Sequence, residues 1–326
     1  MKRNPPFKYE ILGIGNPIVD YIMHVDEDYV AQLEGYKGGM EIVDYATVKQ
    51  IIERQTVVKK SAGGSATNTI KGLAHLGKKC GLIGKIGDDL TGQEFTLALQ
   101  KKGIEPLYQT SSLPTARAAC LITPDGERTF RTYPGPMSTF RPKELNPNLF
   151  ENVQLVFLEG YNLLNPGVTE KAMALAKQAG AKIAFDISSV EMAFNYKPTI
   201  IQLLEQYVDI LFANEEESIA LTKTPPAEGC KLLKKLCETV VIHSPKGCWV
   251  GQHTLDLFIP IEPVVPLDST GAGDLFTSGF LYGYLNNLTI DRSVTLGAFA
   301  GREAVQILGA ELPAETWKKI QNLMIE

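Results

Sequence analysis

The stretch Asp268-Ser269-Thr270-Gly271-Ala272-Gly273-Asp274-Leu275-Phe276 follows an apolar, proline-broken run (259–267) and opens a helical pattern that continues to Tyr284. Its small residues leave backbone N–H groups bare at the start of a helix, where the helix dipole also favours negative charge. Asp274 is itself an anion, so we interpret it as a base that stands beside these donors. Phosphoryl transfer to a hydroxyl needs this pairing of donors and carboxylate. The alternative is a glycine turn followed by an acidic first helical turn.

The composition is that of a globular protein that is neither nucleic-acid-binding nor membrane-spanning. The 326 residues predict one large domain with an accessory piece, and the contents of 44% hydrophobic and 21% charged residues are ordinary. A net charge of −5 argues against a nucleic-acid partner. We find neither a signal-peptide pattern nor an apolar run of about 18 residues. The five scattered cysteines indicate reduced thiols in a cytoplasmic protein.

Polar residues follow the first predicted strand, residues 9–14. The sequence Gly15-Asn16-Pro17-Ile18-Val19-Asp20 comes next, and its proline and missing third glycine argue against a dinucleotide-binding loop. Asn16 and Asp20 lie just past a strand end, where an open α/β sheet binds ligands. A plain turn is the alternative.

A second small-residue loop, Ser61-Ala62-Gly63-Gly64-Ser65-Ala66-Thr67-Asn68-Thr69, precedes a helix that ends near Gly77. A backbone this bare lets a polar ligand lie close to the main chain. Tight packing of helix against sheet explains the same composition equally well.

Residues 117–133 predict a hairpin around the turn Thr123-Pro124-Asp125-Gly126-Glu127. Together with residues 16–45, which we interpret as short strands, it forms a small antiparallel sheet over the pocket. The two-residue period puts Arg128 and Phe130 on one face of this sheet and Arg131 on the other.

From residue 153 onward, strands alternate with helices, which is typical of a parallel sheet covered by helices. The expected strands are 153–158, 182–185, 208–212 and 239–242, and the expected helices are 168–179, 198–206, 215–222, 228–237, 291–307 and 314–325. Polar or aromatic residues stand at the strand ends: Glu159, Tyr161, Asp186, Asn214, His243 and Ser244. They indicate a ligand crevice at one edge of the sheet.

Two of these strand ends suit a nucleotide. Asn214 and Glu217 share one face of a helix and could hold a hydrated Mg²⁺ and its phosphates, although acidic first turns often serve only the dipole. The turn from Ser244 to Gly247 suits a phosphate edge, and a plain turn is again the alternative.

Taken together, the motifs resemble the ribokinase-like (PfkB) family of carbohydrate and nucleoside kinases over essentially the whole chain. Residues 62–69 match the first family signature, 268–274 match the second, and Asn214-x-x-Glu217 matches the metal motif. The resemblance implies a single domain (1–326), a three-layer α/β/α sandwich with a mostly parallel central sheet. It also implies a small β-sheet lid formed by about 16–45 and 110–138.

The resemblance assigns roles to the matching residues. Asp274 deprotonates the acceptor hydroxyl, and the N–H groups of Gly271, Ala272 and Gly273 form an anion hole. ATP is the phosphate donor, bound by Asn214, Ser244, Gly247, Gly271 and Gly273. Asn214 and Glu217 organise Mg²⁺, and activation by a monovalent cation stays open. Asn16, Asp20, Gly64 and Asn68 bind ribose hydroxyls.

Within the family, the chain is similar to the adenosine kinase-like branch in residues 15–20, 126–129 and 158–161. The similarity implies that Arg128 moves with the lid toward the phosphates, and that Met40, Ile42 and Phe130 face the base. Adenosine kinases tend to carry a Phe pair where this chain has Tyr161-Asn162. Either Tyr161 stacks on the base in their place, or the base preference of this chain differs.

We therefore expect a cytoplasmic kinase that phosphorylates the 5′-hydroxyl of a nucleoside, with adenosine first. One alternative is a sugar kinase of the same family that acts on a ribose- or fructose-like substrate. Another is a non-catalytic nucleotide-binding protein, against which the retention of Asp274 argues. The lid strands could stay single or pair in a homodimer.

Overall fold

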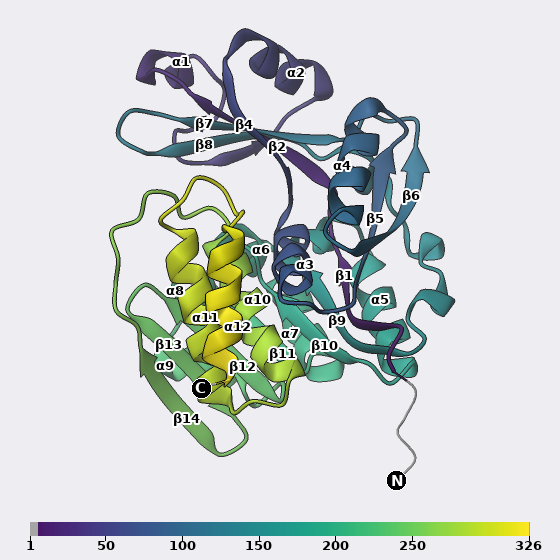
Figure 1. Cartoon of the computed structure of the whole chain (residues 1–326), viewed down its shortest axis with the longest axis vertical. Coiled ribbons are helices and arrows are strands. Elements are labelled where there is room, and N and C mark those ends of the chain that lie inside the picture. Colours follow the sequence, from purple (N-terminus) through teal and green to yellow (C-terminus); the bar gives the residue numbers. More distant parts are fainter. Residues whose placement is uncertain (1–5, 326) are drawn as a thin grey trace.

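A computed structural model describes residues 6–325, and within them the strands form two sheets (Figure 1). The larger sheet has nine strands in the order β14-β13-β12-β11-β10-β9-β1-β5-β6. Their bounds are β1 (Tyr9–Ile14), β5 (Cys80–Gly87), β6 (Ile104–Ser111), β9 (Val153–Glu159), β10 (Lys182–Asp186), β11 (Ile210–Asn214), β12 (Thr239–Ser244), β13 (Gly247–Gln252) and β14 (Leu255–Pro260).

The larger sheet is mostly parallel, as the sequence predicts. β1 lies between β9 and β5 and runs parallel to both, while only β13 and β14 join in antiparallel fashion. A parallel sheet that is covered on both faces needs strands that are apolar throughout. Every residue of β9 except Gln154 is buried, which fits that requirement.

Helices cover both faces of this sheet and complete a three-layer α/β/α sandwich (Figure 1). One face packs against α3 (Ser65–His75), α4 (Leu90–Gln100), α10 (Ala272–Leu285), α11 (Ile290–Ala304) and α12 (Ala314–Ile325). The other packs against α5 (Val168–Gln178), α6 (Val190–Asn195), α7 (Lys197–Gln206), α8 (Glu215–Thr222) and α9 (Pro226–Leu233). Four 3₁₀ segments lie within the described residues: η1 (Gly135–Thr139), η2 (Pro142–Glu144), η3 (Pro147–Leu149) and η4 (Gly160–Leu164). The helices predicted between residues 168 and 325 are all present, with ends that shift by up to four residues.

The smaller sheet has the order β3-β8-β7-β2-β4 and lies above the carboxyl ends of the large sheet's strands (Figure 1). Its strands are β2 (Ile18–His24), β3 (Met40–Ile42), β4 (Val57–Gly63), β7 (Ala116–Ile122) and β8 (Arg128–Tyr133). Two helices, α1 (Glu27–Ala31) and α2 (Tyr45–Arg54), pack on its outer face through apolar residues such as Val30 and Val48.

The smaller sheet differs from the sequence prediction in four details. β4 lies outside the predicted ranges 16–45 and 110–138, and the first of these ranges contains the short helix α1. The sheet is also mixed, because β2 runs parallel to β7 and β3 runs parallel to β8. Each parallel pair joins strands that are distant in sequence, whereas only the β7–β8 hairpin carries a local signal. Finally, the predicted lid range 110–138 begins inside β6, which belongs to the large sheet.

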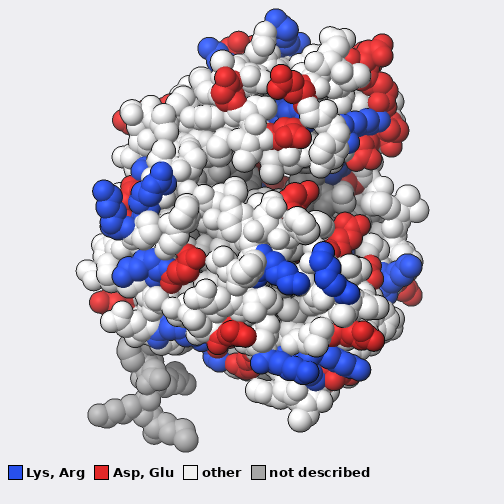
Figure 2. All heavy atoms as spheres, turned by 180° about the vertical axis from the view of Figure 1, so that it is seen from behind, with Lys and Arg blue, Asp and Glu red and all other residues white. Residues whose placement is uncertain are grey.

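The molecule is hollowed between the two sheets on the side seen in Figure 2, where Lys and Arg are mixed with Asp and Glu. The polar strand ends predicted to form a crevice lie below the smaller sheet, at the carboxyl edge of the larger one. Among residues 6–325, no helix is both long enough and apolar enough to cross a membrane.

Candidate active site

The loop 268–271 and the first turn of α10 form the floor of the site. Gly271 is the N-cap of α10 and adopts a left-handed conformation, with φ of 73°. The Ala272 N–H donates to the carbonyl of Ser269 at 3.2 Å and is therefore used within the turn. Of the three amides predicted to bind an anion, those of Gly271 and Gly273 have no backbone acceptor within residues 6–325.

Asp274, the predicted base, stands in the first turn of α10 with both carboxylate oxygens hydrogen-bonded to α3. Oδ1 accepts from the Ser65 hydroxyl at 2.7 Å, and Oδ2 accepts from the Asn68 amide at 2.9 Å. Burial raises the pKa of Asp274, while these two donors act in the opposite direction. The two glycine loops, which are about 200 residues apart in sequence, therefore meet at this carboxylate.

Gly64 lets the loop that carries Asn16 come close to α3. Gly64 has a φ of 96°, and a Cβ there would lie 2.5 Å from the carbonyl oxygen of Asn16. A side chain at this position would therefore be strained and would also collide with backbone. This requirement accounts for the second small-residue loop better than general tight packing does.

Within residues 6–325, the side chains of Asn16 and Asp20 leave part of their hydrogen-bonding capacity unused. The Asn16 amide donates to the carbonyl of Pro134 at 3.1 Å, but its buried Oδ1 has no partner within residues 6–325. Asp20 lies against Gly63, and burial raises the pKa of its carboxyl group to about 7. Buried polar groups are normally paired, so both side chains suit a polar ligand.

Glu159, at the end of β9, connects the loop that contains Asn16 with the start of α3. Its Oε1 accepts from the Asn16 N–H at 3.0 Å and its Oε2 accepts from the Ala66 N–H at 2.6 Å. Burial raises the pKa of Glu159 to about 7. The sequence indicates Glu159 only as a polar strand end, because its partners are distant along the chain.

The inner face of the smaller sheet carries four of the predicted ligand-facing residues. The register pairs Met40 with Phe130, and Arg128 and Ile42 share their face because they are two residues away along each strand. Met40 is 43% exposed and Ile42 is 57% exposed, so both are open to a ligand. Arg131 lies on the opposite face, as predicted, and donates to backbone carbonyls in the interior.

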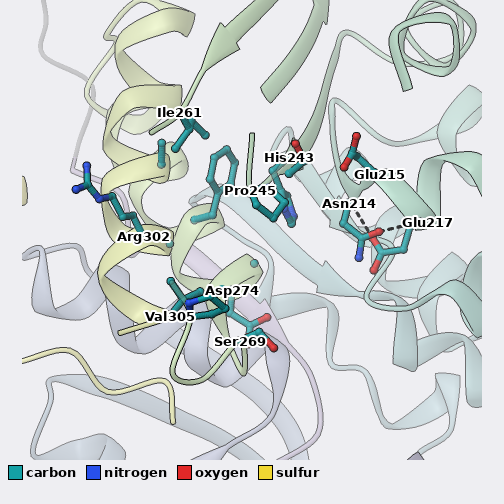
Figure 3. Close-up of a pocket in the computed structure, with 18 of the residues that line it drawn as sticks. Asn214, Glu215, Glu217, His243, Pro245, Ile261, Ser269, Asp274, Arg302 and Val305 are labelled. Atoms are coloured by element: carbon teal, nitrogen blue, oxygen red, sulfur yellow. Dashed lines mark hydrogen bonds between the residues drawn. The ribbon is translucent and has the colours of Figure 1, made fainter. Parts of the chain in front are cut away.

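A pocket of about 870 Å³ extends from Asp274 along the carboxyl edge of the large sheet (Figure 3). Its walls include the predicted residues Ser244, Asn214, Glu217, Gly271 and Gly273. Gly247 does not line this pocket; it is buried, and a Cβ there would overlap the ring of Phe258.

Tyr161 also lines this pocket, beside Asp186 and Ser188, whereas Met40 and Phe130 do not. Its hydroxyl group lies 3.4 Å from the carbonyl oxygen of Ser188, to which it donates. Tyr161 therefore lies with the strand-end acids in a pocket that the apolar residues of the smaller sheet do not line.

Asn214 and Glu217 form a reciprocal cap on α8 (Figure 3). The Asn214 Oδ1 accepts from the Glu217 N–H, and the Glu217 carboxylate accepts from the Asn214 N–H, both at 2.8 Å. Burial raises the pKa of Glu217 to about 7. Among the described residues, no three His, Cys, Asp or Glu side chains converge as a metal cluster. This donor set of few oxygens fits Mg²⁺, which keeps most of its waters and substrate phosphates as ligands.

His243 is a further pocket residue that packs against Phe276, with ring centroids 5.0 Å apart. Burial lowers the pKa of His243 to about 4, so its imidazole is neutral. It offers the pocket an aromatic surface without charge.

A family model described as pfkB family carbohydrate kinase matches residues 38–317. The chain belongs to this family. An adenosine kinase of Saccharomyces cerevisiae is 24% identical over 336 residues, which cover 94% of this chain and 97% of that protein. The crystal structure of adenosine kinase from Sinorhizobium meliloti is similar with a TM-score of 0.88 at 28% identity, and covers 97% of this chain and 99% of that one. The crystal structure of a probable sugar kinase from Rhizobium etli is similar with a TM-score of 0.88 at 27% identity. This similarity covers 97% of this chain and 98% of that one.

In this pfkB-family kinase, sequence reasoning missed Ser65 as a partner of the candidate base. The signal that could have found it is its place at the first position of α3, in the same loop as Gly64. A serine at a helix start is usually read as serving its own helix. Here the hydroxyl group serves another helix instead.

Proposed function

We propose that this kinase transfers a phosphoryl group from ATP to the 5′-hydroxyl of a nucleoside, with adenosine as the first candidate. The observation that carries the proposal is the position of Asp274. Its carboxylate stands beside the unused amides of Gly271 and Gly273, at the mouth of a pocket of about 870 Å³. Base and anion donors are thus side by side, as phosphoryl transfer requires.

Asp274 acts as the general base in this mechanism. It accepts the proton of the acceptor hydroxyl as that oxygen attacks the phosphoryl group in line. The hydrogen bonds from Ser65 and Asn68 favour its ionised form and fix its orientation. The smaller sheet serves as a lid that excludes water from the transfer.

The acceptor is held from two sides. Asn16, Asp20 and Asn68 bind the ribose hydroxyls, and the unpaired Oδ1 of Asn16 supports this role. The exposed apolar side chains of Met40 and Ile42 lie on the lid and pack on the nucleobase of the acceptor.

The nucleotide pocket supports ATP as the donor. Ser244 and His243 line its far wall, and the amides of Gly271 and Gly273 donate to the transferred phosphoryl group. Asn214 and Glu217 would hold Mg²⁺, which when bound would neutralise phosphate charge. Glu217 keeps one carboxylate oxygen free of its cap, which supports that assignment.

A sugar kinase is the second candidate, and the likeness to a probable sugar kinase of Rhizobium etli favours it. A small sugar needs fewer apolar contacts than a nucleobase does. The exposed Met40 and Ile42 therefore favour the nucleoside, since they would have no partner over a bare sugar.

All five cysteines are free thiols, which supports a reducing compartment such as the cytoplasm. The edge strands of the lid, β3 and β4, are available for pairing in a homodimer, and a monomer is the other arrangement.

The test is ADP release with MgATP against nucleosides, ribose, fructose and sugar phosphates. Turnover of adenosine with a KM between about 1 µM and 1 mM supports the proposal. Turnover of sugars alone would retain Asp274 as base and reject the nucleoside assignment of Met40 and Ile42. Binding of ATP without turnover of any acceptor would reject the kinase reaction.

A further inference from the structure

Lys71 is a lysine inside the protein, with 3% of its surface exposed. It belongs to α3 and lies three residues after Asn68, so the two side chains share one helix face. Its ammonium group donates to the carbonyl oxygen of Ala62 at 2.5 Å. Burying an ammonium group is unfavourable unless negative charges lie close to it. Lys71 must therefore have partners that compensate this burial.

Glu311 is one partner, but its charge is shared. Its Oε1 lies 3.8 Å from the Lys71 ammonium nitrogen and 3.3 Å from that of Lys102. Its side chain is 35% exposed, so water screens it further. Glu311 alone therefore does not balance a fully buried ammonium group.

The remaining negative charges around Lys71 are Asp20 and Asp274. Asp20 lies against Gly63, and Lys71 is bonded to the carbonyl of the preceding residue, Ala62. Asp274 accepts a hydrogen bond from Asn68, which lies one helical turn before Lys71 on α3. The charge of Lys71 lowers the pKa of both carboxyl groups, against the effect of their burial.

Lys71 is also distinctive among the basic residues near the site. Other acids face Asp274 from the surrounding elements: Asp20, Glu159, Asp186 and Glu217. Within residues 6–325, the fully buried basic residues are Lys71 and Arg131, and Arg131 lies on the far face of the lid. Lys71 is thus the buried cation that faces this acidic group.

We propose that Lys71 is a positioning residue whose buried ammonium group favours the ionised forms of Asp20 and Asp274 against the effect of their burial, so that one binds the acceptor hydroxyls and the other takes the proton. The inference rests on the proposed function, because that function gives the two aspartates their roles. Lys71 itself touches neither acceptor nor nucleotide in this arrangement; it acts through the two carboxylates.

The experiment compares three variants with the wild type in kcat/KM for the acceptor, measured between pH 5 and 9. Lys71→Met removes the charge and keeps the length of the chain. Glu311→Gln breaks the same ion pair from the other side and leaves Lys71 less neutralised. Lys71→Arg keeps the charge. Thermal unfolding of each variant identifies any that fail to fold.

The charge role predicts shifts of opposite sign. Lys71→Met should move the acid limb of the profile up by about one pH unit, which is about a tenfold loss below the midpoint. Glu311→Gln should move it down, and Lys71→Arg should recover most of the wild-type profile. If Lys71→Met does not fold, the direction of the Glu311→Gln shift decides alone.

Two results would overturn the inference. An equal loss in Lys71→Met and Glu311→Gln, with no displacement of the pH profile, would mean that the ion pair only anchors the loop before α12. An unchanged profile in Lys71→Met would exclude any role. Absence of turnover by the wild type would instead reject the proposed function, and this inference with it.

Discussion

Arg128 and Asp268 form an ion pair that joins the smaller sheet to the loop at the start of α10. Asp268 is buried, and its carboxylate also accepts from the Thr270 N–H at 2.6 Å and from the Gly309 N–H at 2.5 Å. One carboxylate thus contacts the loop at the start of α10, the loop after α11 and the smaller sheet. The position of the smaller sheet and the conformation of the loop before Asp274 are therefore coupled through Asp268.

Replacing Arg128 with Ala should lower kcat/KM for the acceptor by about 10- to 100-fold. The change leaves Asp268 buried without its counter-charge, and breaking a buried pair from one side is typically worth about 3–5 kcal/mol. Steady-state kinetics and thermal unfolding measure the two effects. Arg54→Ala, which removes an exposed arginine at the end of α2, is the matched control. Equal kinetics in both variants would contradict the coupling.

Asp274→Asn should lower kcat by roughly 10²- to 10⁴-fold, the usual range for a general base, because an amide cannot take the hydroxyl proton. Binding of nucleoside should change little, since the amide still accepts a hydrogen bond. Calorimetry and steady-state kinetics separate these effects. Asp291→Asn is the control, because Asp291 is an exposed aspartate in the first turn of α11. Near-normal turnover by Asp274→Asn would sink the mechanism.

Local patterns were sufficient to predict the sandwich and the positions of the two small-residue loops at helix starts. Strands that are mostly apolar and helices with a regular apolar period can be recognised from adjacent residues, as β9 and α5 show. The loop before Asp274 is also local, because bare backbone at a helix start has few other uses. For these features the sequence prediction agrees with the structure.

Contacts between distant residues could not be predicted in the same way. Glu159 accepts from the N–H of Asn16, 143 residues away, and no pattern near either residue indicates the bond. β4 was missed because it pairs only with β2, across two helices and a short strand. The burial of Lys71 was missed because a lysine on a helix is ordinarily exposed.

Gly271→Ala should lower both stability and kcat. The left-handed φ of 73° alone costs about 1–2 kcal/mol for an L-residue, and the new Cβ would also overlap that of Ala310. Gly180→Ala is the matched control, since Gly180 has a φ of 80° and nothing within 4 Å of an added Cβ. Thermal unfolding should detect the strain in both variants, but only Gly271→Ala should lose turnover. Equal melting temperatures would show that the loop can shift away from Ala310.

The buried acids predict that the unliganded protein is more stable at pH 6.5 than at pH 8. Burial raises the pKa of Asp20 and that of Glu159 to about 7, above the values near 4 of unfolded chains. Between these values the folded state binds more protons than the unfolded state. The free energy of unfolding therefore falls as the pH rises through 7.

The titration of histidine limits, at its acidic end, the pH range over which this fall in the free energy of unfolding can be measured. The pKa of His243 is lowered to about 4, so the unfolded state binds the extra proton once the pH falls below about 6.5, which destabilises the folded protein. Urea titrations at pH 6.5 and pH 8 compare the stability on either side of the carboxyl titration, with a smaller opposing contribution from histidine at pH 6.5 and an expected net difference of about 1 kcal/mol. Asp20→Asn should reduce that difference, and Asp291→Asn should leave it unchanged. A free energy of unfolding that rises from pH 6.5 to 8 would mean that these carboxyl groups are already ionised at pH 6.5, with the burial of Asp20 fully compensated by the charge of Lys71.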